Sequence, residues 1–129
     1  MVRQDKIAYL ITFFENDTDA IIDDVSLNLW LTDYNPSEAI SQLITDGDVF
    51  PGNVINNRLL SRLGIIITSD IEKTETLLSE FIPFTRHKLL FVNIQKMGLQ
   101  ICTAFSPTCV NCSLSEICDF YNGKNRWAI

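Results

Sequence analysis

Long hydrophobic runs are absent from this sequence. No apolar stretch approaches the roughly 18 residues that a membrane-spanning helix needs, so we expect no membrane contact. Residues 1–6 show no apolar segment followed by a small-residue cleavage site, and we therefore expect an intracellular reducing compartment such as the cytoplasm. Internal repeats and low-complexity linkers are also missing. The 129 residues, 47% of them hydrophobic, suffice for a single domain with a buried core.

Basic side chains are scarce in the first part of the chain. Residues 1–52 carry two basic and ten acidic side chains, whereas residues 53–129 carry eight basic and six acidic ones. Nucleic acid is bound through accumulated Lys and Arg, so any phosphate contact is expected in the second part. The acidic, apolar N-terminal half is expected to meet a protein partner, with a solvated surface as the alternative. The candidate phosphate contacts are Arg58, Arg62, Arg86 and Lys88.

Histidine occurs only once. His87 stands between Arg86 and Lys88, and the sequence supplies no neighbouring residues with which it would bind a metal. We expect it to lie in a solvated, basic first turn of a helix, with a phosphate contact as the alternative.

All four cysteines lie in one stretch, residues 102–118. Cys102, Cys109, Cys112 and Cys118 are separated by six, two and five residues. Disulfides would need an oxidising compartment. A single zinc ion accepts four thiolates, but its sites usually combine two close pairs, and here only Cys109 and Cys112 form one. An iron–sulfur cubane takes one thiolate per iron and suits the wider spread, although ligand softness alone does not separate it from zinc.

With Gly98 four residues before the first cysteine, this stretch resembles the iron–sulfur loop that closes DNA glycosylases of the endonuclease III and adenine-glycosylase type. In that family the loop holds a 4Fe–4S cluster, and the four cysteines match its ligand positions one for one. The resemblance implies an all-α fold, a small helical domain closed by a C-terminal iron–sulfur cluster loop. Its expected parts are an acidic helical half (1–52), a helical core (53–101), the cluster loop (102–118) and a tail (122–129).

Both catalytic positions of that family differ in this chain. The glycines of the family's helix–hairpin–helix turn are absent, and Ser37 stands at or near the position of the nucleophilic lysine. A hydroxyl cannot form the Schiff base that an amine forms. Alignment on Arg58 and on residues 62–64 places Asn53 where the family has its catalytic aspartate, and an amide carries no negative charge.

The resemblance therefore implies a non-catalytic relative, a binding module or subunit of a DNA-processing or repair assembly. An active DNA glycosylase or AP lyase of base excision repair is the alternative, and redox sensing through the cluster is a third hypothesis. The family's loop also carries basic side chains that touch phosphate, whereas residues 103–108 carry no charge here. Phe105 within them indicates an apolar contact, either inside this chain or with another one.

Helical periodicity and capping residues predict the elements along the chain. Gly98 is expected to permit close packing beneath the cluster loop. The predicted helices are Gln4–Asn16, one around Ile22–Leu29, one over Pro36–Asp46, Val54–Leu63 with Gly64 as its stop, one that starts in a capping box at Ser69–Glu72 and ends at Pro83, and one from Thr85 toward Cys102.

Overall fold

The structure of the protein is a computed structural model, and it describes residues 2–20 and 50–124. Every regular element in these two ranges is helical, which confirms the all-α class. None of the helices described there is long and apolar enough to cross a membrane. The helices expected around Ile22–Leu29 and Pro36–Asp46, and Ser37 with them, lie outside the described residues. The elements are α1 (Gln4–Asn16), α4 (Val54–Leu63), α5 (Ile71–Phe81), α6 (His87–Gln100) and two short 3-10 turns, η1 (Phe84–Arg86) and η2 (Cys109–Asn111).

Helix α4 begins and ends where its sequence predicts. The Oδ1 atom of Asn53 accepts a hydrogen bond from the backbone N–H of Asn56 at 2.8 Å, which caps the first turn. Gly64 has a φ of 89°, the left-handed conformation that favours glycine, and closes the last turn. A Cβ atom at this position would lie 2.2 Å from Oδ2 of Asp119. The glycine therefore also lets the segment after the last cysteine approach α4.

The start of α5 differs from the prediction. The expected capping box used Ser69, but the observed cap is Asp70, whose Oδ1 accepts from the backbone N–H groups of Glu72 at 3.0 Å and Lys73 at 3.3 Å. The helix consequently begins one residue later. It ends before Pro83, as predicted, because the residue before a proline is disfavoured in the helical conformation.

Helix α6 begins two residues after Thr85, since residues 84–86 form η1. His87, at its start, is only 1% exposed. Its Nε2 atom lies 2.9 Å from the carbonyl oxygen of Ile82, and its ring meets that of Phe50 edge-on with 5.7 Å between centroids. The prediction of a solvated first turn around His87 is therefore wrong, and the imidazole belongs to the core.

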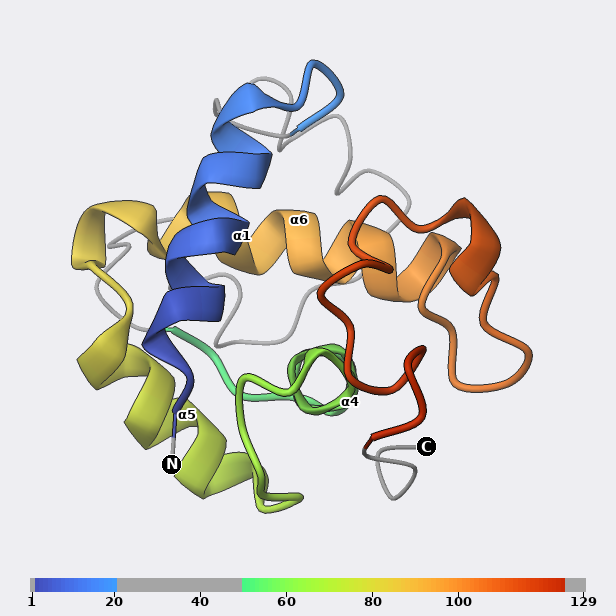
Figure 1. Ribbon diagram of the computed structural model, residues 1–129. Helices are drawn as coiled ribbons and strands as arrows, with labels where there is room; N and C mark the ends of the chain where they lie inside the picture. The colour runs from blue at the N-terminus through green and yellow to red at the C-terminus, as the bar shows by residue number, and fades with distance from the viewer. Residues whose placement is uncertain (1, 21–49, 125–129) are drawn as a thin grey trace.

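Helix α6 is the central element of the described fold. It packs against α1 and α4, and in Figure 1 α1 crosses in front of it while α4 is viewed nearly along its axis. A Cβ atom on Gly98 would lie 2.4 Å from Cγ2 of Ile55, so the glycine lets α6 approach α4 closely. The cysteine loop, residues 102–118, then leaves the end of α6. Buried core residues include Leu10 and Phe14 of α1, Leu59 and Leu63 of α4, and Leu90 and Ile94 of α6.

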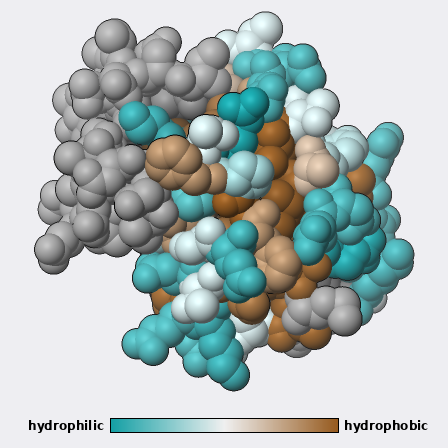
Figure 2. All heavy atoms as spheres, turned by 90° about the vertical axis from the view of Figure 1, so that its left-hand side faces the viewer, coloured by the Kyte–Doolittle hydropathy of each residue, from teal (hydrophilic) through white to brown (hydrophobic). Residues whose placement is uncertain are grey.

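Some apolar side chains remain at the surface. Figure 2 shows the face at the left of Figure 1, where hydrophobic atoms form a central band between hydrophilic areas. Helix α5 and η1 lie on this side (Figure 1). Among their residues, Ile71, Phe81 and Phe84 are 37%, 36% and 59% exposed. This face is thus a mixture of polar and apolar groups.

Candidate metal centre

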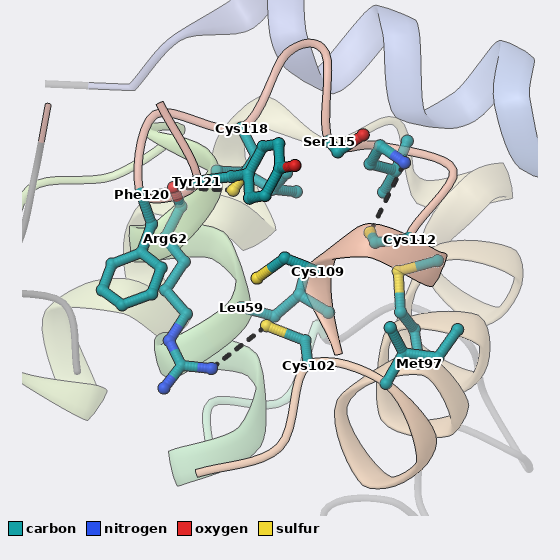
Figure 3. Close-up of a pocket in the computed structure, with 13 residues that line it drawn as sticks. Leu59, Arg62, Met97, Cys102, Cys109, Cys112, Ser115, Cys118, Phe120 and Tyr121 are labelled. Atoms are coloured by element: carbon teal, nitrogen blue, oxygen red, sulfur yellow. Dashed lines mark hydrogen bonds between the residues drawn. The ribbon is translucent and has the colours of Figure 1, made fainter. Parts of the chain in front are cut away.

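The four cysteines line one cavity between α4, the end of α6 and the cysteine loop (Figure 3). All four are free thiols, so none is paired in a disulfide. Their neighbours in the described part of the wall are mostly apolar, and none of these is Asp, Glu or His. Within residues 2–20 and 50–124, no three Cys, His, Asp or Glu side chains lie close enough together to hold a metal ion. The thiols therefore share a cavity without converging on a single point. The other wall residues are Leu59, Arg62, Leu63, Met97, Ile101, Leu114, Ser115, Phe120 and Tyr121.

The free space between the thiols is small. The volume open to the centre of a water molecule is about 20 Å³. The η2 side of the wall reaches the protein surface, where Val110 is 82% exposed. The donor set itself fits a thiophilic group, because it consists of cysteine sulfur alone.

Hydrogen-bond donors are directed at the sulfur atoms. The Nη1 atom of Arg62 donates to Sγ of Cys102 at 3.3 Å, and the backbone N–H of Leu114 donates to Sγ of Cys112 at 3.4 Å. The thiol of Cys118 in turn donates to the backbone carbonyl of Arg62 at 3.3 Å. Donors of this kind stabilise thiolates and tune the potential of iron–sulfur clusters.

Two of the thiols resist ionisation as long as no cation balances them. Burial raises the pKa of the Cys112 thiol, and the neighbouring thiolates of Cys102, Cys118 and Cys109 raise it further. Burial also raises the pKa of Cys118, while the backbone N–H groups that follow it partly offset this effect. A metal ligand must be deprotonated, so metal binding here is expected to displace protons and to supply the missing positive charge.

Among the described residues, Arg62 is the largest side chain that is fully buried, so the prediction made for it needs correcting. We expected it to contact phosphate, but it is only 2% exposed. Its guanidinium donates to the carbonyl oxygens of Thr103 at 2.8 Å and Ala104 at 3.3 Å, and it lies 4.9 Å from the ring centre of Phe120. The residue therefore holds the cysteine loop and is not available to a nucleic acid.

The other candidate phosphate contacts do not gather into one patch. Arg58 donates to the carbonyl oxygens of Gly98 at 2.8 Å and Cys102 at 3.1 Å, so it caps the end of α6, and burial lowers its pKa. Arg86 forms an ion pair with Glu15 at 2.9 Å at the opposite end of α6. Lys88 also lies near that end and is half-buried. The structure thus places Arg58 and Arg62 at one end of α6 and Arg86 and Lys88 at the other.

Asn53, at the catalytic aspartate position of the resembled family, is part of an amide network. Its Nδ2 atom donates to Oε1 of Gln95 at 3.1 Å, and Nε2 of Gln95 donates to Oδ1 of Asn56 at 2.7 Å. Asn56 and Gln95 are both fully buried. The sequence analysis did not single out Gln95, because its partners Asn53 and Asn56 lie 42 and 39 residues earlier in the chain. Asn53 therefore has a structural role in this network.

Lys6 is a second residue that the sequence analysis missed. Its buried ammonium donates to the carbonyl oxygens of Leu63 and Ile117, the latter at 2.7 Å, and pairs with Oδ1 of Asp119 at 3.0 Å. It therefore connects α1 to the end of α4 and to both sides of the last cysteine. The available signal was its position four residues before Leu10, on the stripe of α1 that faces the core.

Comparison with models of protein families, with curated proteins and with solved structures found no match to this chain. The interpretation of the cysteine cavity consequently rests on its own geometry and on the cysteine spacing.

Proposed function

We propose that this protein is a non-catalytic 4Fe–4S protein and that it serves as a binding module or subunit of a DNA-processing or repair assembly. Cys102, Cys109, Cys112 and Cys118 would each bind one iron. The observation that carries the proposal is the cavity that all four thiols share, in which none of the described wall residues is His, Asp or Glu. A bound cluster would supply four metal–sulfur bonds that crosslink the cysteine loop to the end of α6.

The spread of the thiols favours a cluster over zinc. A tetrahedral zinc needs four sulfurs at about 2.3 Å from one point, and the thiols of the described chain do not converge in this way. A cubane places its ligands around a larger body. The charge of Arg62 and the backbone N–H directed at Cys112 also suit a centre that bears net negative charge from its thiolates. Together with the 6-2-5 cysteine spacing, these features support the cluster.

The surroundings of Asn53 support a role without catalysis. Its oxygen caps α4 and its nitrogen donates to Gln95, so both ends of the amide serve the fold.

The basic side chains support a protein partner more than DNA. Arg62 is buried, Arg58 caps α6 and Arg86 is paired with Glu15. Each lost phosphate contact weakens DNA affinity further at physiological salt.

Metal analysis tests the cluster directly. Protein purified without oxygen is expected to contain about four irons per chain and to show a broad visible charge-transfer band. Single Cys→Ser variants at the four positions should each lose iron, whereas Ser113→Ala, in the same loop, should keep it. One zinc per chain and no visible band, or cysteines recovered as disulfides from protein handled anaerobically, would refute the cluster.

An activity assay tests the non-catalytic role. The iron-loaded protein is incubated with DNA duplexes that contain abasic sites or damaged bases, and strand cleavage is followed on denaturing gels. We expect no cleavage above that of a protein-free control. Cleavage that Asn53→Ala abolishes would instead establish an active glycosylase or lyase and defeat the proposed role.

A further inference from the structure

The four cysteine sulfurs differ in the hydrogen bonds that reach them. Arg62 donates to Sγ of Cys102 at 3.3 Å, and a backbone N–H donates to Sγ of Cys112 at 3.4 Å. Backbone N–H groups are directed at the sulfur of Cys118, which also bonds to the carbonyl of Arg62. Among the described residues, none donates to Sγ of Cys109 (Figure 3). Such partners orient metal ligands, and losing one typically lowers metal affinity about 10–100-fold.

The backbone around the cysteines shows the same difference. The carbonyl of Cys102 accepts a hydrogen bond from Arg58 of α4 at 3.1 Å, and the thiol of Cys118 donates to another carbonyl of α4 at 3.3 Å. In η2, the carbonyl of Cys109 accepts from the backbone N–H of Cys112 at 3.0 Å, a contact within a single turn. A small shift of Cys109 therefore disturbs local contacts, whereas a shift of either end of the loop disturbs contacts with α4.

The surface of the protein is open beside Cys109. Val110 is 82% exposed, and Thr108, on the other side of the half-buried cysteine, is exposed as well. Phe105, in the same loop, is 88% exposed and packs against none of the described core. The side chain of Cys118, in contrast, is buried within that core. A small molecule from solution thus has a shorter path to the position of Cys109 than to that of Cys118.

The surroundings of the thiols define which ligand would suit this position. A donor that replaces a cysteine at a thiophilic metal is itself best a sulfur. Residues 101–115 carry no charged side chain, and the described wall of the cavity is mostly apolar. A charged group costs free energy in such a wall, and the thiolates of a loaded site would repel an anion in addition. These features favour a small, uncharged thiol.

We infer that Cys109 is the exchangeable ligand of the proposed cluster and that a small, uncharged thiol from solution takes its place. In this exchange the bond between iron and the Cys109 sulfur breaks, and a bond between the same iron and the incoming sulfur forms. The proton of the incoming thiol passes to Cys109. Each sulfur keeps its own electron pair, so the exchange needs neither an oxidant nor a reductant. The inference rests on the proposed 4Fe–4S function and adds a ligand to that site.

Chemical rescue of alanine variants is the first test. Each cysteine is replaced by alanine, and the variants are purified without oxygen, with and without 2-mercaptoethanol. With this thiol, Cys109→Ala should contain about four irons per chain and show the visible band, and dialysis against thiol-free buffer should remove its iron. Cys102→Ala, Cys112→Ala and Cys118→Ala should lack iron in both conditions. The charged analogue 2-mercaptoethanesulfonate should restore iron to Cys109→Ala less well.

Alkylation of the unaltered protein is the second test, and it decides the matter if Cys109→Ala does not fold. Iron-containing protein is treated with 2-mercaptoethanol and then with iodoacetamide, all without oxygen. Alkylation of each cysteine is measured by mass spectrometry while iron content and visible spectrum are followed. Cys109 should react at least about tenfold faster than the other three cysteines, with the iron retained, and more slowly when 2-mercaptoethanol is left out.

Two results would overturn the inference. One is alkylation that is equal at all four cysteines or fastest at another one. The other is a folded Cys109→Ala variant that lacks iron even with 2-mercaptoethanol. Equal rescue by the sulfonate would refute the uncharged class of ligand. If the unaltered protein contains about four irons, these results refute exchange at Cys109 alone, whereas an unaltered protein without iron refutes the cluster and the exchange together.

Discussion

Replacing Arg62 by methionine removes the buried guanidinium while it keeps most of the apolar volume. The change takes away two hydrogen bonds to the carbonyls of Thr103 and Ala104, one to the sulfur of Cys102, and the contact with the Phe120 ring. Hydrogen bonds from a charged donor contribute about 1.5–3 kcal/mol each, and a cation–π contact about 0.5–2 kcal/mol. Allowing for the apolar gain of methionine, we expect the free energy of unfolding to fall by about 3–5 kcal/mol.

Urea unfolding of the protein with the proposed cluster bound, followed by circular dichroism, measures this loss. With a slope of about 1–3 kcal/mol per molar urea, the midpoint should fall by at least about 1 M. The urea midpoint of Arg62→Lys should lie between those of Arg62→Met and the unaltered protein, because an ammonium keeps the charge but not the planar fork of donors. The rate of iron release to a chelator should rise in the same order, since the Cys102 side of the loop loses its support.

Arg86→Met is the matched control for Arg62→Met. It also removes a guanidinium, but from an ion pair with Glu15 in which both side chains are 43% exposed. Exposed pairs contribute about 0–1 kcal/mol, so its midpoint should stay near that of the unaltered protein. Equal midpoints and equal iron-release rates for the two methionine variants would refute a supporting role of Arg62 in the cysteine loop.

Three other substitutions test separate contacts. Lys6→Met should lower the free energy of unfolding by about 3 kcal/mol, because it leaves a partly buried carboxylate and two carbonyls without their cation. A loss below about 1 kcal/mol in urea unfolding would contradict a stabilising role of the Lys6 contacts. Gly64→Ala should lower the free energy of unfolding by about 2 kcal/mol or more, since φ is 89° and the new Cβ would meet Asp119. An unchanged melting temperature would show that the turn accommodates alanine. Asn53→Asp should reduce the melting temperature, because a carboxylate cannot donate to Oε1 of Gln95. The variant should not cleave abasic-site DNA, and cleavage would support the enzymatic hypothesis.

Local sequence features predicted the bounds of those helices whose ends are set by residues close by in the sequence. The bounds Gln4–Asn16 and Val54–Leu63 agree with α1 and α4, and Gly64 ends α4 as expected. Caps and apolar periodicity depend on residues within one or two turns of each other, so the sequence contains them. The cap of α5 was misplaced by one residue because Ser69 and Asp70 are both good caps and only one can be used.

Buried polar residues were not predictable in the same way. The acceptors of Arg62 lie about 40 residues further along the chain, and the sequence near α4 does not predict them. His87 has a basic residue on each side, yet neighbouring positions on a helix point in different directions, so charged neighbours do not keep a residue in solvent. The cysteine spacing indicated a common site, and the structure brings the four thiols to one cavity, while the group that they bind stays a prediction.

The contacts of Lys6 also constrain the order in which this protein folds. Its three oxygen acceptors lie 57, 111 and 113 residues after it in the chain. During synthesis, α1 therefore emerges long before the groups that neutralise its lysine exist. Contacts with such separation close late and slow the overall reaction. Docking of the first helix is thus expected to be among the final events of folding, once the segment around residue 119 has been made.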